Sequence, residues 1–192
     1  PKKNLNRTVT ISGEPALEIF QSPYWQLEDL GFKLYQDSGD IYHLIILGLV
    51  PARFAFYIRR QLSLTSISIL KKRIDSLQQY SHIGTKLKSI ETMAHYDGDD
   101  WAIVLVEMDN LFRDLFEIER DYSNLCEFQD ICLTLCRRYA TYREAKALRE
   151  RWIKNHDEFF QRCSTNVNWV KEFKDRINVH AMWHVFPVFE KW

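Results

Sequence analysis

The strongest constraint on the fold of this chain is a long stretch without helix-breaking residues. No proline lies between Ala52 and Phe186, and no glycine follows Gly98. Proline and glycine are the residues that most often end helices and begin turns. Their scarcity argues against an all-β sandwich, a collagen-like chain or a loop-rich disulfide scaffold. The sequence therefore predicts a mainly α-helical protein.

Length and composition favour one folded domain. The chain has 192 residues, and its hydrophobic share of 46% is enough for a packed core and excludes general disorder. We expect a single domain over 1–192, in which 1–50 form a mixed cap and 51–186 form a multi-helix bundle. The cap is predicted to be a small N-terminal β-hairpin or an irregular segment.

The cap contains the least regular patterns of the chain. Residues 8–12 are β-prone and end at Gly13, while Pro15 suits the first turn of a short helix. Residues 32–47 alternate in a way that favours a hairpin, but they also fit two short helices broken at Gly39. We favour the hairpin.

Beyond Pro51, apolar residues recur at three- and four-residue spacing, the period of a helix with one buried face. Helices are predicted over 51–62, 66–80, 85–95, 100–122, 126–139 and 166–185, with another after a capping box at 141–144. Asp99 or Asp100 is expected to cap the longest of them. The run Asp97–Asp100 resembles part of a calcium loop, but it lacks the later ligand positions and is interpreted as a helix cap.

Charge is segregated along the chain, although the net charge is zero. Residues 53–88 carry eight basic groups and one acid, a net +7, and residues 91–130 carry two basic groups and twelve acids, a net −10. Such asymmetry can mark surfaces that bind partners. It can equally mean that oppositely charged helices lie side by side and neutralise each other.

Two histidines near the end of the chain have the spacing of metal ligands. His180 and His184 lie four residues apart, on one face of the last predicted helix, and His95 is a candidate third ligand. This set resembles the metal-binding four-helix bundles of the DinB type, which implies a divalent metal such as zinc or nickel. The alternative is that these histidines pack in the core or near the negative end of the helix dipole, with no cofactor.

An arginine and a histidine in the penultimate predicted helix form a second candidate site. Arg151 and His156 are separated by four residues, and this spacing resembles the motif of HEPN-type helical ribonucleases. The resemblance implies a cleft shared by two protomers, in which the histidine handles the 2′-hydroxyl proton and the arginine stabilises the phosphate. Trp152 departs from the polar residue that this family prefers after the arginine. The alternative is a solvated helix face of mixed charge.

The basic segment offers a third candidate, an anion-binding surface. Phosphate binding needs several cations on one surface. The candidate residues for nucleic-acid or anion binding are Arg59, Arg60, Lys71, Lys72, Arg73, Lys86 and Lys88. No helix-turn-helix or RNA-binding signature accompanies them.

Membrane and redox signals are weak. The sequence has no apolar run long enough to span a bilayer and does not start with a secretory signal pattern, so no membrane span is expected. The four cysteines lack metal-site and redox-motif spacing, which favours reduced thiols in the cytoplasm.

Taken together, these patterns favour a non-catalytic interaction or regulatory module that binds a protein partner or a second copy of itself. Four aromatic residues near the C-terminus are the expected partner interface: Trp183, Phe186, Phe189 and Trp192. The alternatives are a helical-bundle enzyme, either metal-dependent or HEPN-like, and a nucleic-acid-binding protein.

Overall fold

The computed structural model describes residues 10–11, 14–15, 43–77, 87–136 and 142–163, and this part of the chain is mainly helical, as predicted. The helical elements are η2 (His43–Leu49), α2 (Val50–Phe56), η3 (Tyr57–Gln61), α3 (Leu64–Leu77), η4 (Ile90–His95), α4 (Gly98–Phe112), α5 (Glu119–Leu135) and α6 (Tyr142–Cys163). Among these helices none is both long and apolar enough to cross a bilayer.

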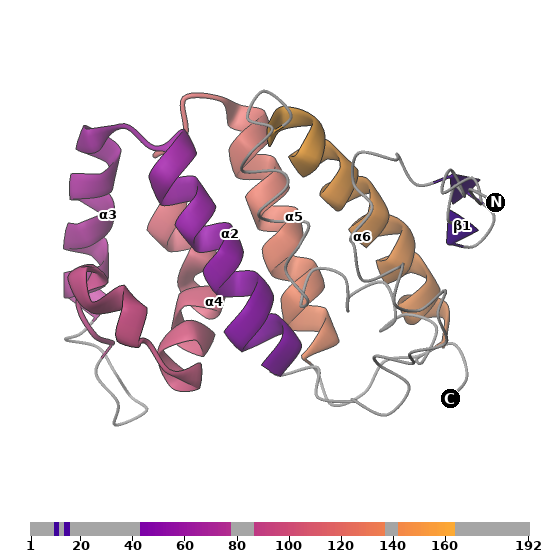
Figure 1. Ribbon diagram of the computed structural model, residues 1–192, viewed down its shortest axis with the longest axis horizontal. Helices are drawn as coiled ribbons and strands as arrows, with labels where there is room; N and C mark the ends of the chain where they lie inside the picture. The colour runs from indigo at the N-terminus through magenta and orange to yellow at the C-terminus, as the bar shows by residue number, and fades with distance from the viewer. Residues whose placement is uncertain (1–9, 12–13, 16–42, 78–86, 137–141, 164–192) are drawn as a thin grey trace, which may run out of the picture.

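The helices α3, α4, α5 and α6 lie in a row, and each packs against the next (Figure 1). Helix α2 and the preceding segment η2 pack against α4, and α2 lies over α4 in Figure 1. The core between these layers is rich in aromatic rings. Phe54 of α2 meets the edges of Trp101 and Phe112 at centroid distances of 5.6 and 5.3 Å. Edge-to-face pairs of this kind stabilise a core beyond their buried area.

One helical stretch runs from residue 43 to residue 61, which corrects the start predicted at Pro51. Pro51 lies in the first turn of α2 and lacks the N–H that would bond back into the preceding turn. The preceding segment, η2, is wound as a wider π-helix. Residues 43–47 are therefore not the second strand of the predicted hairpin. Residues 32–42 lie outside the described part of the chain.

Near the N-terminus the structure describes two short segments, β1 (Thr10–Ile11) and β2 (Glu14–Pro15), which pair antiparallel. The rest of the predicted N-terminal cap before residue 43 lies outside the described residues.

The helix predicted over 100–122 is two helices. α4 ends at Phe112, and the chain turns through Asp114, whose φ of 61° lies in the left-handed region. The turn lets Leu115 and Phe116 pack on the core before α5 begins at Glu119, seven residues earlier than predicted. The apolar spacing continues through the turn, so periodicity alone did not reveal it. The helix predicted over 85–95 is only the short 3₁₀ segment η4.

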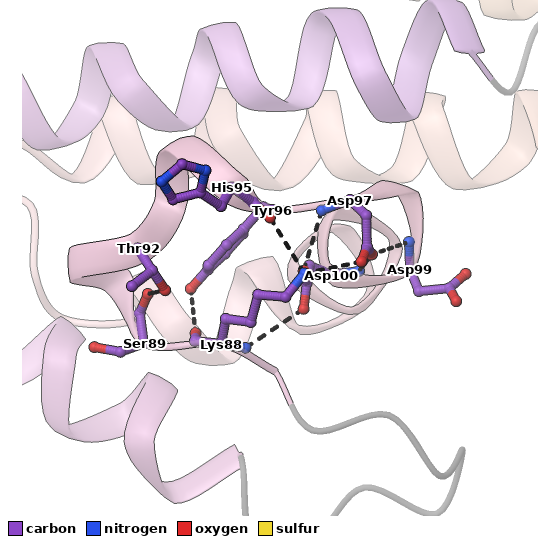
Figure 2. Close-up of polar contacts among 8 residues, drawn as sticks. All are labelled: Lys88, Ser89, Thr92, His95, Tyr96, Asp97, Asp99 and Asp100. Carbon is purple, nitrogen blue, oxygen red and sulfur yellow. Dashed lines mark hydrogen bonds and ion pairs between the residues drawn. The ribbon is translucent and has the colours of Figure 1, made fainter.

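Both ends of α4 are capped by side chains. At its start, the Asp97 carboxylate accepts hydrogen bonds from the backbone N–H groups of Asp99 and Asp100, and the Asp100 carboxylate accepts from Asp97 N–H. Lys88 pairs with both Asp97 and Asp100, at 2.9 and 2.7 Å (Figure 2). At its end, one nitrogen of the Arg73 guanidinium donates to three carbonyl groups of the last turn and the residue after it. The cap predicted within Asp97–Asp100 is confirmed, but Asp97 is the capping residue.

We predict that Asp97→Ala lowers the melting temperature by about 2–4 °C, because α4 loses a side-chain cap and Lys88 loses one of its partners. Thermal unfolding followed by circular dichroism measures this change. Asp99→Ala is the matched control, since the Asp99 side chain points away from the network (Figure 2). Equal melting temperatures for the two variants would contradict the capping role.

Candidate functional site

A cleft of about 510 Å³, lined mainly by polar and charged residues, lies between α5 and α6. From one contacting pair to the next, the residue number increases along α5 and decreases along α6, so the two helices are antiparallel. Arg120 meets Glu158, Asn124 meets Asn155, and Glu127 meets Arg151. The residues that line the cleft are Arg120, Ser123, Asn124, Cys126, Glu127, Asp130, Arg151, Lys154, Asn155 and Glu158.

Ion pairs hold both ends of this cleft. Arg151 donates to the two carboxylate oxygens of Glu127 at 2.6 and 3.0 Å and to Asp130 at 2.6 Å. These hydrogen bonds raise the pKa of Arg151 above its usual range. At the other end Arg120 lies 3.5 Å from Glu158. The charged side chains of the two walls therefore bind mostly to each other.

The floor of the cleft is a pair of asparagines. The side-chain amide of Asn124 donates to the backbone carbonyl of Asn155 at 3.0 Å, and that of Asn155 donates to the carbonyl of Asn124 at 2.7 Å. Both residues are buried. This reciprocal pairing satisfies polar groups that would be costly to bury alone and locks the register of α5 against α6.

Beneath the floor lies a buried cation, Arg53 of α2. Its guanidinium donates to the side-chain oxygens of Asn124 at 3.2 Å and Asn155 at 3.0 Å. The same group lies over the rings of Phe159 and Phe128, with centroid distances of 3.4 and 4.8 Å. A guanidinium is weakly hydrated and planar, which suits it to such an environment.

In the sequence, Arg53 is one charge among the eight basic groups of residues 53–88, and it is not among the predicted site residues. The sequence does contain a sign that Arg53 is buried. Arg53 lies in the run Ala52–Tyr57, in which all the remaining residues are alanine or aromatic. A charged residue inside such a run has to be buried or interrupt the apolar surface. Whether the charged residue is buried depends on which residues of distant helices face it.

The structure does not bring Arg151 and His156 together on one surface. Arg151 lies at the rim of the cleft, whereas His156 is 1% exposed and packs between Trp152 and Phe160. Burial, and secondarily the nearby charge of Arg53, hold the pKa of His156 well below its usual value. A neutral, enclosed imidazole of this kind contributes to packing.

Several of the predicted anion-binding residues are engaged within the fold. Lys71 pairs with Glu91, Lys88 pairs with Asp97 and Asp100, and Arg73 caps α4. Arg59, Arg60 and Lys72 are exposed, and Lys86 lies outside the described residues. The interpretation that the basic and acidic segments neutralise each other is confirmed for these pairs.

The predicted metal site is described only at His95, which is exposed on η4. His180 and His184 lie outside the described residues, as do Trp183, Phe186, Phe189 and Trp192. Within the described ranges, no three His, Cys, Asp or Glu side chains are grouped as metal ligands would be. Cys126, Cys132 and Cys136 are free thiols.

Comparison of the chain with protein-family models, with curated proteins and with solved structures finds no match. The cleft between α5 and α6 combines an open volume, walls of paired charges and a floor of two buried, hydrogen-bonded amides. Such a surface can bind and orient a partner through hydrogen bonds and charge.

We predict that Arg53→Met lowers the free energy of unfolding by about 2–5 kcal/mol. The substitution leaves two buried amide oxygens without their donor, at roughly 1–3 kcal/mol each, and removes the cation–π contacts. Urea unfolding measures the change. Arg60→Met, at an exposed position of the same helical stretch, is the control and should shift the free energy by less than about 0.5 kcal/mol. Equal stability of the two variants would exclude Arg53 as a structural centre.

Stability is also predicted to fall in mild acid because of His156. In the unfolded chain His156 binds a proton near its usual pKa of 6.5, whereas the folded protein keeps it neutral to a much lower pH. Between these pKa values the unfolded state binds more protons, so each pH unit below about 6.5 costs up to about 1.4 kcal/mol. Urea unfolding from pH 7 downward should show this slope, and His156→Phe should reduce it. His95→Phe, at an exposed site, should leave it unchanged, and a slope unaffected by His156→Phe would refute the assignment.

Proposed function

We propose that this chain is a non-catalytic helical interaction module whose partner binds in the cleft between α5 and α6. The observation that carries the proposal is the cleft itself: an open volume of about 510 Å³ on a floor fixed by Asn124, Asn155 and Arg53. A rigid floor reduces the ordering cost of binding. The volume suits a few side chains of a peptide segment.

The engaged state of the candidate catalytic groups supports a binding role over the ribonuclease alternative. Arg151 is bound by two carboxylates, and His156 is enclosed by aromatic rings. Proton transfer to a substrate requires a group within hydrogen-bond reach of that substrate. The cleft offers its hydrogen-bonding groups for recognition instead.

The contacts of the basic segment likewise favour a protein partner over a nucleic acid. Lys71, Arg73 and Lys88 each form an ion pair or a helix cap within the fold. Binding along a phosphate backbone gains affinity from each cation that is available to release counterions. Cations engaged within the fold contribute less to such binding.

Selection from a random peptide library on the immobilised chain tests this proposal. We expect enriched peptides to bind the wild-type protein and to lose binding to Ser123→Trp, because an indole at this exposed lining position fills the cleft. Lys146→Trp is the control, since Lys146 is exposed on α6 away from the cleft. Circular dichroism verifies that both variants fold.

Two results would refute the proposal: a selection without enrichment, or enriched peptides that bind Ser123→Trp as well as the wild type. Sedimentation equilibrium of the chain alone adds the case of a second copy. A concentration-dependent dimer that Ser123→Trp abolishes would identify a second copy of the chain as the partner.

A further inference from the structure

We infer that the partner segment presents an acidic side chain to the middle of the cleft, where Lys154 and Ser123 hold its carboxylate. This inference rests on the proposed function, because it names the chemistry of the partner that the cleft accepts. It follows from which hydrogen-bonding groups of the cleft are already engaged and which are available.

The acidic groups of the cleft are engaged. Glu127 and Asp130 both bind Arg151, and Glu158 pairs with Arg120. A basic side chain of a partner would have to compete with these arginines for the same oxygens. Arg151 in particular holds Glu127 through two parallel hydrogen bonds, the geometry that is hardest to displace.

Both available groups can donate hydrogen bonds, and one of them carries a positive charge. Lys154 is exposed on the α6 wall and forms no ion pair with any described residue. Ser123 is exposed on the α5 wall, and its hydroxyl has no hydrogen bond within the described part of the chain. Each immediately precedes one asparagine of the Asn124–Asn155 pair, so both lie at the middle of the cleft. Both line the cleft, an ammonium on one wall and a hydroxyl on the other, and a carboxylate accepts hydrogen bonds from either group.

The side-chain acceptors of the floor are engaged as well. The side-chain oxygens of Asn124 and Asn155 are turned toward Arg53, at 3.2 and 3.0 Å. Each amide nitrogen uses one hydrogen for the opposite backbone carbonyl and carries a second. The acceptor oxygens of the floor are therefore engaged by Arg53 and do not favour a basic partner group. A ligand that accepts hydrogen bonds and carries negative charge matches the available groups of the two walls, Lys154 and Ser123.

Titration with two peptides of equal length, a Glu-Gly repeat and a Lys-Gly repeat, tests the inference at low salt. We expect the Glu-Gly peptide to bind the folded wild-type chain, with amide NMR shifts at Ser123 and Lys154. Lys154→Gln should weaken this binding about fivefold, the effect of losing one exposed charged contact. Lys146→Gln removes an equal charge from α6 outside the cleft and should have little effect.

The other outcomes overturn the inference. If the Lys-Gly peptide binds in the cleft instead, the interaction module stands and the acidic partner is excluded. If neither peptide binds, the acidic partner is excluded, and the random-library selection separately decides whether the cleft binds a partner. If an oligothymidine binds more tightly than the Glu-Gly peptide and loses affinity in Lys154→Gln, the cleft recognises phosphate rather than carboxylate.

Discussion

The guanidinium of Arg53 joins three helices at one point. The Arg53 side chain extends from α2 to the contact between α5 and α6, where its guanidinium donates to the side-chain oxygens of Asn124 and Asn155. Those asparagines in turn bind each other's helices. A charge is costly to bury, so the core has to supply both hydrogen-bond acceptors and ring faces around it. The position of the cleft floor follows from this requirement.

Charge pairing organises the outer layer in the same way. Lys88 reaches two aspartates at the start of α4, and Arg73 neutralises the carbonyl end of the same helix. Arg151 bridges α6 to α5 through two carboxylates. Exposed pairs of this kind stabilise weakly one by one, but they select which helix lies beside which. Part of the two charged segments seen in the sequence is thereby paired within the fold, while Arg59, Arg60 and Lys72 are exposed and Lys154 lies exposed at the α5–α6 cleft.

The sequence predicted the buried face of a helix correctly but not always the position of its end. Trp101, Val104, Met108 and Leu111 are buried on one face of α4, as their spacing indicated. The stripe then continued to Ile118, which is 52% exposed, because the turn through Asp114 redirects the chain. The hairpin predicted over 32–47 is wrong at residues 43–47 for a related reason. A short apolar run such as Ile45–Ile46 suits a buried strand or a buried helix equally, and only the neighbouring layer decides.

By itself, the sequence determined the helical class, most of the inward faces and the cap before α4, since these depend on local spacing and local hydrogen bonds. It also supplied Arg151 and His156 as candidates but could not tell that one would reach a pair of carboxylates and the other a set of aromatic rings. Arg53, Asn124 and Asn155 are separated by up to 102 positions in the chain and meet only when α2, α5 and α6 pack. The tertiary structure alone decided which of the described charges are buried, which are paired and which remain exposed, because these outcomes depend on groups brought together from distant helices.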